Sequence, residues 1–150
     1  MGGIPPAEPS QFRSDIFKQT PHFMLSVDYI HRFISSLVFT SLVETAVLFL
    51  MVRFVFRNKE LSLKSIILTG VFASFATIPY VWFVFPYIRK WPRQTSLYFS
   101  EPFAFLVETF FYRTFLKTGW GQSFFLSLVT NLASYFLGPL LRSYGLWIYW

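Results

Sequence analysis

Two glutamates stand within long apolar stretches of this sequence, each inside the same four letters. The segment Leu42–Thr45 reads LVET, and the segment Leu106–Thr109 reads LVET again. An ionised side chain at the centre of a bilayer costs about 3 kcal/mol or more, so acids at such positions commonly handle ions or hold helices together. Glu44 and Glu108 are therefore the first candidates for chemistry in this chain.

Both glutamates are predicted to lie near the middle of the membrane. Glu44 precedes Arg53 by nine residues, and Glu108 precedes Lys117 by nine. Nine helical residues rise about 13–14 Å. They also make two and a half turns, so each carboxyl group faces away from the basic residue of its own helix. Each acid must be protonated, hydrogen-bonded to another helix or joined to a bound ion.

Further polar side chains are expected beside the two acids. Counted from the ends of their segments, Thr69 and Asn131 should reach the same depth, and Thr40 and Tyr112 lie one turn from a glutamate on its own face. The triplets at 72–74 and 132–134 supply small residues for close helix approach. The predicted polar layer comprises Glu44, Glu108, Thr69, Asn131, Thr40 and Tyr112.

The role of this layer stays open between three interpretations. A protonated acid bonded to Asn131 or Thr69 would lock two helical hairpins together. Alternatively, the pair handles a proton or cation, or holds a polar headgroup. A glutamate that faces lipid could also meet another subunit. Arg113 either extends to the interface or forms an ion pair with Glu101 or Glu108 of a neighbouring protomer.

The composition indicates a membrane protein. Hydrophobic residues make up 54% of the 150 residues and charged residues only 13%, whereas a soluble domain is about 25% charged. Lipid must therefore cover much of the surface. The net charge of +6 arises largely from basic residues at the ends of apolar segments, where they contact headgroups. We therefore expect no nucleic-acid partner.

Few residue types suited to catalysis are present. The chain has no Cys and two His, which rules out thiolate chemistry and Cys-ligated metals. Paired Asp motifs, Gly-rich phosphate loops and nucleophile elbows are also missing. We therefore expect no enzyme and no metal site, and the sequence identifies no cofactor.

Four apolar segments predict four transmembrane helices. A kink is expected at Pro79, and a kink or stop at Gly138–Pro139. Pro102 is placed in the first turn of its helix, with Ser100 or Glu101 as the cap. The segments cover roughly residues 29–56, 61–88, 96–117 and 122–141.

The predicted fold is all-α, a polytopic membrane protein with four transmembrane helices arranged as two tandem-repeated helical hairpins. Besides the repeated tetrapeptide, Thr69–Val71 matches Thr130–Leu132, and Pro79 matches Pro139. Parallel repeats of this kind occur in transporters, with sites at the repeat interface. The expected parts are a flexible and interfacial segment at 1–28, a transmembrane domain at 29–150 with hairpin repeats at 29–88 and 96–142, and an interfacial tail at 143–150.

Three functions are compatible with these features. The first is transport or permeation of a proton, cation or small polar solute at the mid-membrane Glu pair. The second is a non-catalytic subunit or assembly factor of a larger membrane complex. The third is a binder of a flat apolar cofactor or quinone, suggested by the 21 Phe. The expected partners are the lipid bilayer and either a homo-oligomer or a larger complex, in a cell membrane (the inner membrane in a bacterium).

Overall fold

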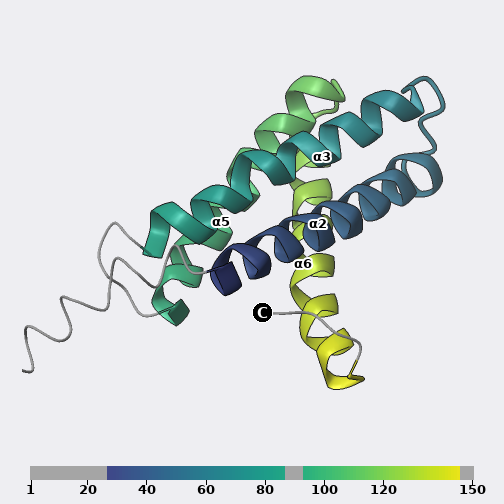
Figure 1. Ribbon diagram of the computed structural model, residues 1–150. Helices are drawn as coiled ribbons and strands as arrows, with labels where there is room; N and C mark the ends of the chain where they lie inside the picture. Colours follow the sequence, from purple (N-terminus) through teal and green to yellow (C-terminus); the bar gives the residue numbers. More distant parts are fainter. Residues whose placement is uncertain (1–26, 87–92, 146–150) are drawn as a thin grey trace, which may run out of the picture.

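The computed structural model describes residues 27–86 and 93–145 (Figure 1). The remaining parts of the predicted N-terminal segment and C-terminal tail, at 1–26 and 146–150, lie outside these ranges. The described residues form helices and turns, which confirms the all-α, four-helix prediction. The helices are α2 (Val27–Leu50) with η1 (Met51–Val55), α3 (Leu63–Pro79) with η2 (Tyr80–Val84), α5 (Arg93–Phe115) and α6 (Trp120–Ser143).

Three of the helices are long and apolar enough to cross a membrane. They are Val27–Val55 with 29 residues, Leu63–Val84 with 22 and Trp120–Ser143 with 24. These correspond to the first, second and fourth predicted spans. The 23 residues of α5 are long enough to cross, at about 1.5 Å each, but its first half carries polar residues such as Ser100 and Glu101. The third span therefore stays a prediction.

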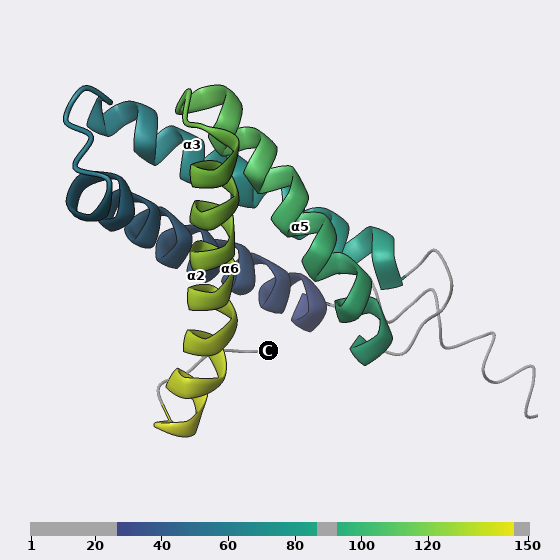
Figure 2. The same ribbon diagram turned by 180° about the vertical axis from the view of Figure 1, so that it is seen from behind.

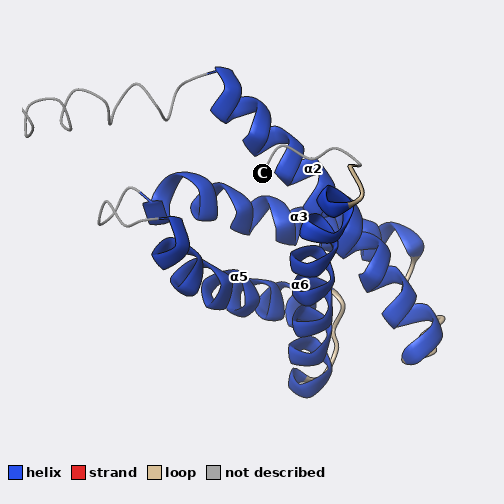
Figure 3. Ribbon diagram, turned by 90° about the horizontal axis from the view of Figure 1, so that it is seen from below, coloured by secondary structure: helices blue, strands red, loops and turns tan. Residues whose placement is uncertain are grey.

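The four helices form one bundle in which α2 and α5 each pack against both α3 and α6. Helices α2 and α3 run side by side, whereas α5 and α6 meet at their turn and diverge away from it (Figures 1 and 2). Both turns, at 56–62 and 116–119, lie at the same end of the bundle, which we call the turn end. The opposite end, where α2 and α5 begin, is called the terminal end; Figure 3 shows the bundle from below.

The first turn is held by side-chain hydrogen bonds to the backbone. The Arg53 guanidinium donates to the carbonyl oxygens of Asn58 at 2.8 Å and Leu61 at 2.6 Å. The Ser62 hydroxyl accepts from the Ser65 amide at 3.1 Å and so satisfies one of the free N–H groups that begin α3. These bonds fix where η1 stops and α3 starts.

Of the prolines singled out from the sequence, Pro102 does not start its helix and Pro139 does not stop its helix, whereas Pro79 lies at a change of helix type. Helix α5 begins at Arg93 and passes through Pro102, so the prediction that Ser100 or Glu101 caps this helix is wrong. A proline in a helix interior removes one backbone hydrogen bond, and packing of α5 against α3 and α6 offsets that loss. Pro139 likewise lies inside α6, which continues to Ser143. At Pro79 the α-helix gives way to the π-helical turn of η2, at the position expected for a kink.

The interior of the bundle is rich in hydroxyl groups, while large apolar side chains cover the outside. Among the described residues, sixteen buried side chains are polar and eleven are hydrophobic. Outward-facing residues such as Leu42, Phe72 and Phe136 are each more than half exposed. In water this distribution would be unfavourable. In lipid it is expected, because small polar residues let helices approach closely and supply hydrogen bonds between them.

Candidate functional site

Glu44 lies in the middle of the bundle and is 2% exposed. Its carboxyl group accepts hydrogen bonds from the Ser74 hydroxyl of α3 at 2.8 Å and from the Ser134 hydroxyl of α6 at 2.9 Å. Ser74 belongs to the hairpin that contains Glu44, and Ser134 belongs to the other hairpin. One acid thus connects three helices.

Glu108 is bound in the same manner and is 1% exposed. Its carboxyl group accepts from the Asn131 side-chain amide of α6 and from the Thr77 hydroxyl of α3 at 3.4 Å. Here Asn131 comes from the same hairpin and Thr77 from the other. Each glutamate therefore has one donor from α3 and one from α6.

The four donors occupy matching positions along the two helices. Ser74 lies eleven residues after Leu63, the first residue of α3, and Asn131 lies eleven after Trp120, the first residue of α6. Thr77 and Ser134 each lie fourteen residues after those starts. Ser74 and Asn131, eleven residues into their helices, each donate to the glutamate of their own hairpin. Thr77 and Ser134, fourteen residues in, each donate to the glutamate of the other hairpin.

The structure places the other predicted layer residues around this pair but not on it. The Tyr112 hydroxyl, one turn from Glu108, lies 3.3 Å from the Thr130 hydroxyl. Thr69 donates to the Ser65 carbonyl of its own helix at 2.7 Å. Thr40 is buried one turn from Glu44. Of the six predicted residues, Glu44, Glu108 and Asn131 therefore make the carboxyl contacts.

Three donors were missed by sequence reasoning. Ser74 and Ser134 end two similar triplets that were interpreted as close-packing segments and not as partners of the carboxyl groups, although each supplies a hydroxyl to Glu44. Thr77 carries no comparable signal in the sequence. We name the set Glu44, Glu108, Ser74, Thr77, Asn131 and Ser134 the carboxyl layer.

Charge within the carboxyl layer is of one sign. Among residues 27–86 and 93–145, the charged groups that act electrostatically on Glu108 are Glu44 and Glu101, both acidic. All four hydrogen-bond donors are neutral. An uncompensated charge in a low-dielectric interior is costly, so a proton or a cation is the species that suits this arrangement. The described residues contain no cluster of three or more His, Cys, Asp or Glu side chains that would hold a metal.

Arg113 lies near the turn end and faces a tryptophan. Its guanidinium carbon is 5.7 Å from the centre of the Trp120 ring, a cation–π distance, and its Nε atom is buried without a hydrogen-bond partner. Glu101 lies twelve residues away on the same helix, about 18 Å along its axis. An ion pair of Arg113 with a neighbouring protomer stays a prediction.

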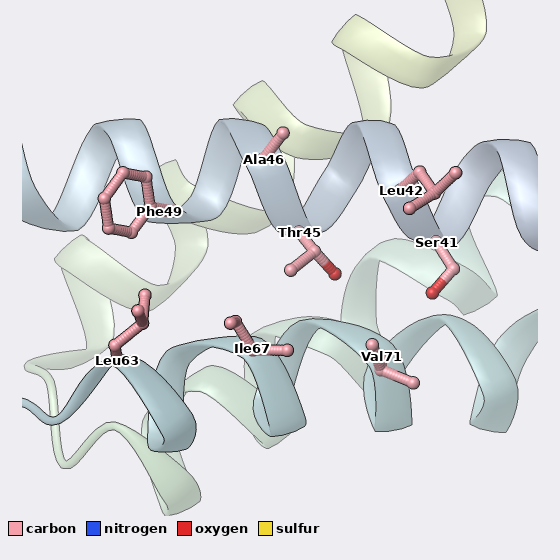
Figure 4. Close-up of a pocket in the computed structure, with 8 residues that line it drawn as sticks. All are labelled: Ser41, Leu42, Thr45, Ala46, Phe49, Leu63, Ile67 and Val71. Atoms are coloured by element: carbon pink, nitrogen blue, oxygen red, sulfur yellow. The ribbon is translucent and has the colours of Figure 1, made fainter.

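An outward-facing groove of about 410 Å³ runs between α2 and α3 (Figure 4). Ser41 and Thr45 point from α2 toward α3, and the Thr45 Oγ1 atom is buried without a hydrogen-bond partner. The flat apolar ligand considered from the sequence would find an apolar surface here. The remaining lining residues are Leu42, Ala46, Phe49, Leu63, Ile67 and Val71.

Fold and site together define a small multi-span helical membrane protein with two buried glutamates at its centre. Comparison of the chain with protein-family models, with curated proteins and with solved structures finds no match.

Proposed function

We propose that this protein is a transport or permeation component in which the carboxyl layer takes up and releases a proton or a monovalent cation. The observation that carries the proposal is the pair of buried acids, each held by two neutral donors from two other helices. Intramembrane carboxyl groups of this kind are typical of proton relays and ion pathways. The proposal involves no chemical conversion of a substrate.

We further propose that the two hairpins are copies of one ancestral hairpin and that α5 crosses the membrane with the other three helices. The positions of the four donors support this duplication, because an exchange of the hairpins maps each hydrogen bond onto its counterpart. The burial pattern agrees. Residues 44, 48 and 52 of α2 and η1 are buried, and so are residues 108, 112 and 116, at a spacing of 64. Positions 66, 69, 70, 73 and 77 are buried in α3, and so are 123, 126, 127, 130 and 134, at a spacing of 57. At this spacing Thr69 corresponds to Leu126 and Pro79 to Phe136, so the proposed register differs from the sequence-based pairing of Thr69 with Thr130 and of Pro79 with Pro139.

Such a two-fold arrangement gives two equivalent carboxyl groups at the interface of the repeats. Parallel repeats related by an axis along the membrane normal place binding sites at this interface. Each carboxyl group touches both α3 and α6, so a change in its protonation or ion binding alters contacts within one hairpin and between the two hairpins. Binding at the layer is thereby coupled to the packing of the bundle.

The experiment is a flux measurement on proteoliposomes that contain the double variant Glu44→Gln with Glu108→Gln. Glutamine keeps the size and the acceptor oxygen but cannot carry the charge. We expect pH-gradient-driven proton flux, or the flux of sodium or potassium, to fall at least about tenfold, the change produced by about 1.4 kcal/mol. Glu60→Gln is the matched control, since Glu60 is an exposed acid in the first turn. Unchanged flux in a folded double variant would contradict the proposal.

A second function, a non-catalytic subunit of a larger membrane complex, is favoured by the same hydrogen bonds. Satisfied carboxyl groups that tie helices together stabilise a scaffold without moving an ion. The many exposed aromatic side chains, among them Phe72, Phe110 and Phe136, also suit a protein partner. This function requires that the native protein elute with a larger complex in mild detergent. Elution as a bare monomer or homodimer would contradict it.

A further inference from the structure

The carboxyl layer is closed toward the turn end by a packed apolar cluster. The cluster includes side chains from every helix of the bundle, and each is at most 2% exposed. The one hydroxyl in it, on Tyr112, is turned to Thr130. Buried hydroxyl groups also lie on this side of the layer, and each of them donates to a backbone carbonyl oxygen; they belong to Thr69, Ser123, Ser127 and Thr130. An ion or hydrated proton that crossed the cluster itself would lose its hydration among apolar side chains. The cluster consists of Leu48, Val52, Ile66, Ala73, Tyr112, Leu116 and Leu126.

The terminal end of the bundle is built differently in its two halves. Between α2 and α3 an apolar cluster of Leu37, Ile78 and Trp82 closes the interior. Along α5, by contrast, the inward-facing positions between the carboxyl layer and the terminal end carry Ala104, Ser100 and the half-buried Glu101. Buried hydroxyl residues occur in both halves, with Ser36 and Thr40 on α2 and Ser96 and Ser100 on α5. The half-buried carboxyl group of Glu101, however, belongs to the α5 half.

A comparison of equivalent positions in the two hairpins identifies the residue at which the two halves of the terminal end differ. At the spacing of 64 that relates Glu44 to Glu108, Ser36 corresponds to Ser100, and both are buried. At the same spacing Leu37, a member of the apolar cluster, corresponds to Glu101. The second hairpin thus has the carboxyl group of Glu101 where the first hairpin has Leu37, a residue of the apolar cluster.

Glu101 is also aligned with the carboxyl layer. It precedes Glu108 by seven residues, or about 10 Å of helix, which places both on one face of α5. Its charge acts on Glu44 and on Glu108. At this end α5 and α6 have diverged from each other (Figure 2).

We propose that the carboxyl layer is reached from the terminal end alone, along α5, and that Glu101 is the first carboxyl group met by an incoming proton or cation. For a proton, the O–H bond at Glu101 breaks as the proton passes to a water molecule of the route, which regenerates the Glu101 carboxylate. A new O–H bond forms at the Glu108 carboxylate as water donates a proton to it, because the two groups, about 10 Å apart along the helix, are too distant for direct transfer. The identity of the cargo rests on the proposed function. The sidedness of access does not, and it is measured separately.

Single cysteines test the route, because the chain contains no Cys of its own. Glu101→Cys and Leu37→Cys form a matched pair at equivalent positions, and Leu126→Cys reports on the turn-end cluster. A charged, membrane-impermeant methanethiosulfonate is added to either side of the proteoliposomes. Two exposed sites, Asp28→Cys at the terminal end and Lys59→Cys in the first turn, define the two sides.

We expect Glu101→Cys to react from the side that labels Asp28→Cys, at least tenfold faster than Leu37→Cys. We expect Leu126→Cys to react from neither side at a comparable rate. Equal rates for the matched pair, or labelling of Glu101→Cys from the Lys59→Cys side, would overturn the inference.

Flux separates this inference from the proposed function. In Glu101→Leu, which copies the equivalent residue of the first hairpin, we expect flux to fall at least fivefold, with partial recovery in Glu101→Asp. If the double variant of Glu44 and Glu108 loses flux while Glu101→Leu keeps it, the inference fails and the proposed function stands. If labelling is one-sided but no variant changes flux, the route stands and the proposed function fails.

Discussion

Gly70 of α3 lies directly against Thr45 of α2. A Cβ atom at Gly70 would lie 2.6 Å from Thr45 Oγ1 and 3.0 Å from Thr45 Cα. The second atom belongs to the backbone and cannot move without shifting the helix. The close approach of α2 and α3, on which the position of Glu44 depends, therefore requires glycine here.

We predict that Gly70→Ala destabilises the bundle although alanine is the better helix former. Alanine gains about 1 kcal/mol in helix propensity, but overpacking a close contact costs about 1–3 kcal/mol, and here the obstacle is backbone. The measurement is unfolding in mixed micelles. Gly121→Ala is the control, since nothing lies within 4 Å of a Cβ at Gly121, and it should be neutral or stabilising. A Gly70→Ala variant as stable as the parent would disprove the tight contact.

The bond from Ser134 to Glu44 should hold the two hairpins together. Interhelical hydrogen bonds in membranes contribute about 0.6 kcal/mol on average and up to about 1.7. We expect Ser134→Ala to lower the free energy of unfolding within this range. The control is Ser143→Ala, whose exposed hydroxyl donates to the Leu140 carbonyl of its own helix. Equal stability of the two variants would show that the bond to Glu44 contributes nothing.

Both hairpin turns contain a residue with a left-handed backbone. Arg57 and Lys117 have φ angles of 52°, and among the described residues they are the only non-glycine residues with positive φ. This conformation costs an L-residue roughly 1–2 kcal/mol. We therefore predict that Arg57→Gly and Lys117→Gly raise the midpoint of thermal unfolding in detergent. Lys59→Gly removes the same charge from the first turn without relieving a positive φ, and should lower the midpoint or leave it unchanged.

The apolar pattern of the sequence was enough to predict where most helices lie. The first, second and fourth segments were expected at 29–56, 61–88 and 122–141, and the helices cover Val27–Val55, Leu63–Val84 and Trp120–Ser143. Long apolar runs bounded by charge determine such segments almost alone. The start of α5 was misplaced because Pro102 was taken as a first-turn residue, and tertiary packing, invisible in one sequence, carries the helix past it.

Part of the carboxyl layer was predicted from the sequence. The rest could not be predicted, because it depends on how the helices pack. Position along a helix can be counted, so the burial of Glu44 and Glu108 was expected. Which hydroxyl meets which carboxyl group depends on how the helices rotate and cross, and this is not encoded locally. The equal spacing to Arg53 and Lys117 agrees with the spacing of 64 that relates the buried positions of α2 and α5, but the two basic residues differ in local structure. The left-handed residue of the first turn is Arg57, whereas Arg53 lies in the π-helical turn before it.

The two asparagines that make side-chain contacts differ in which atom they use, and this gives a test of the contact at Glu108. Asn131 donates through Nδ2 to the carboxyl group, whereas Asn58 accepts through Oδ1 from the amides of Glu60 and Leu61. Aspartate keeps an acceptor but loses the amide donor. Asn131→Asp should therefore bring two carboxyl groups face to face and destabilise the bundle at neutral pH by about 1–3 kcal/mol, the cost of an unmet buried group.

Acidification should restore much of that stability, because a protonated carboxyl group can donate to its neighbour. Asn58→Asp should stay close to the parent at neutral pH. The measurement is the free energy of unfolding of both variants and the parent across a pH series. A loss in Asn131→Asp that is independent of pH, or an equal loss in Asn58→Asp, would contradict the donor role of Asn131. The carboxyl layer would then have to be held by its three hydroxyl groups alone.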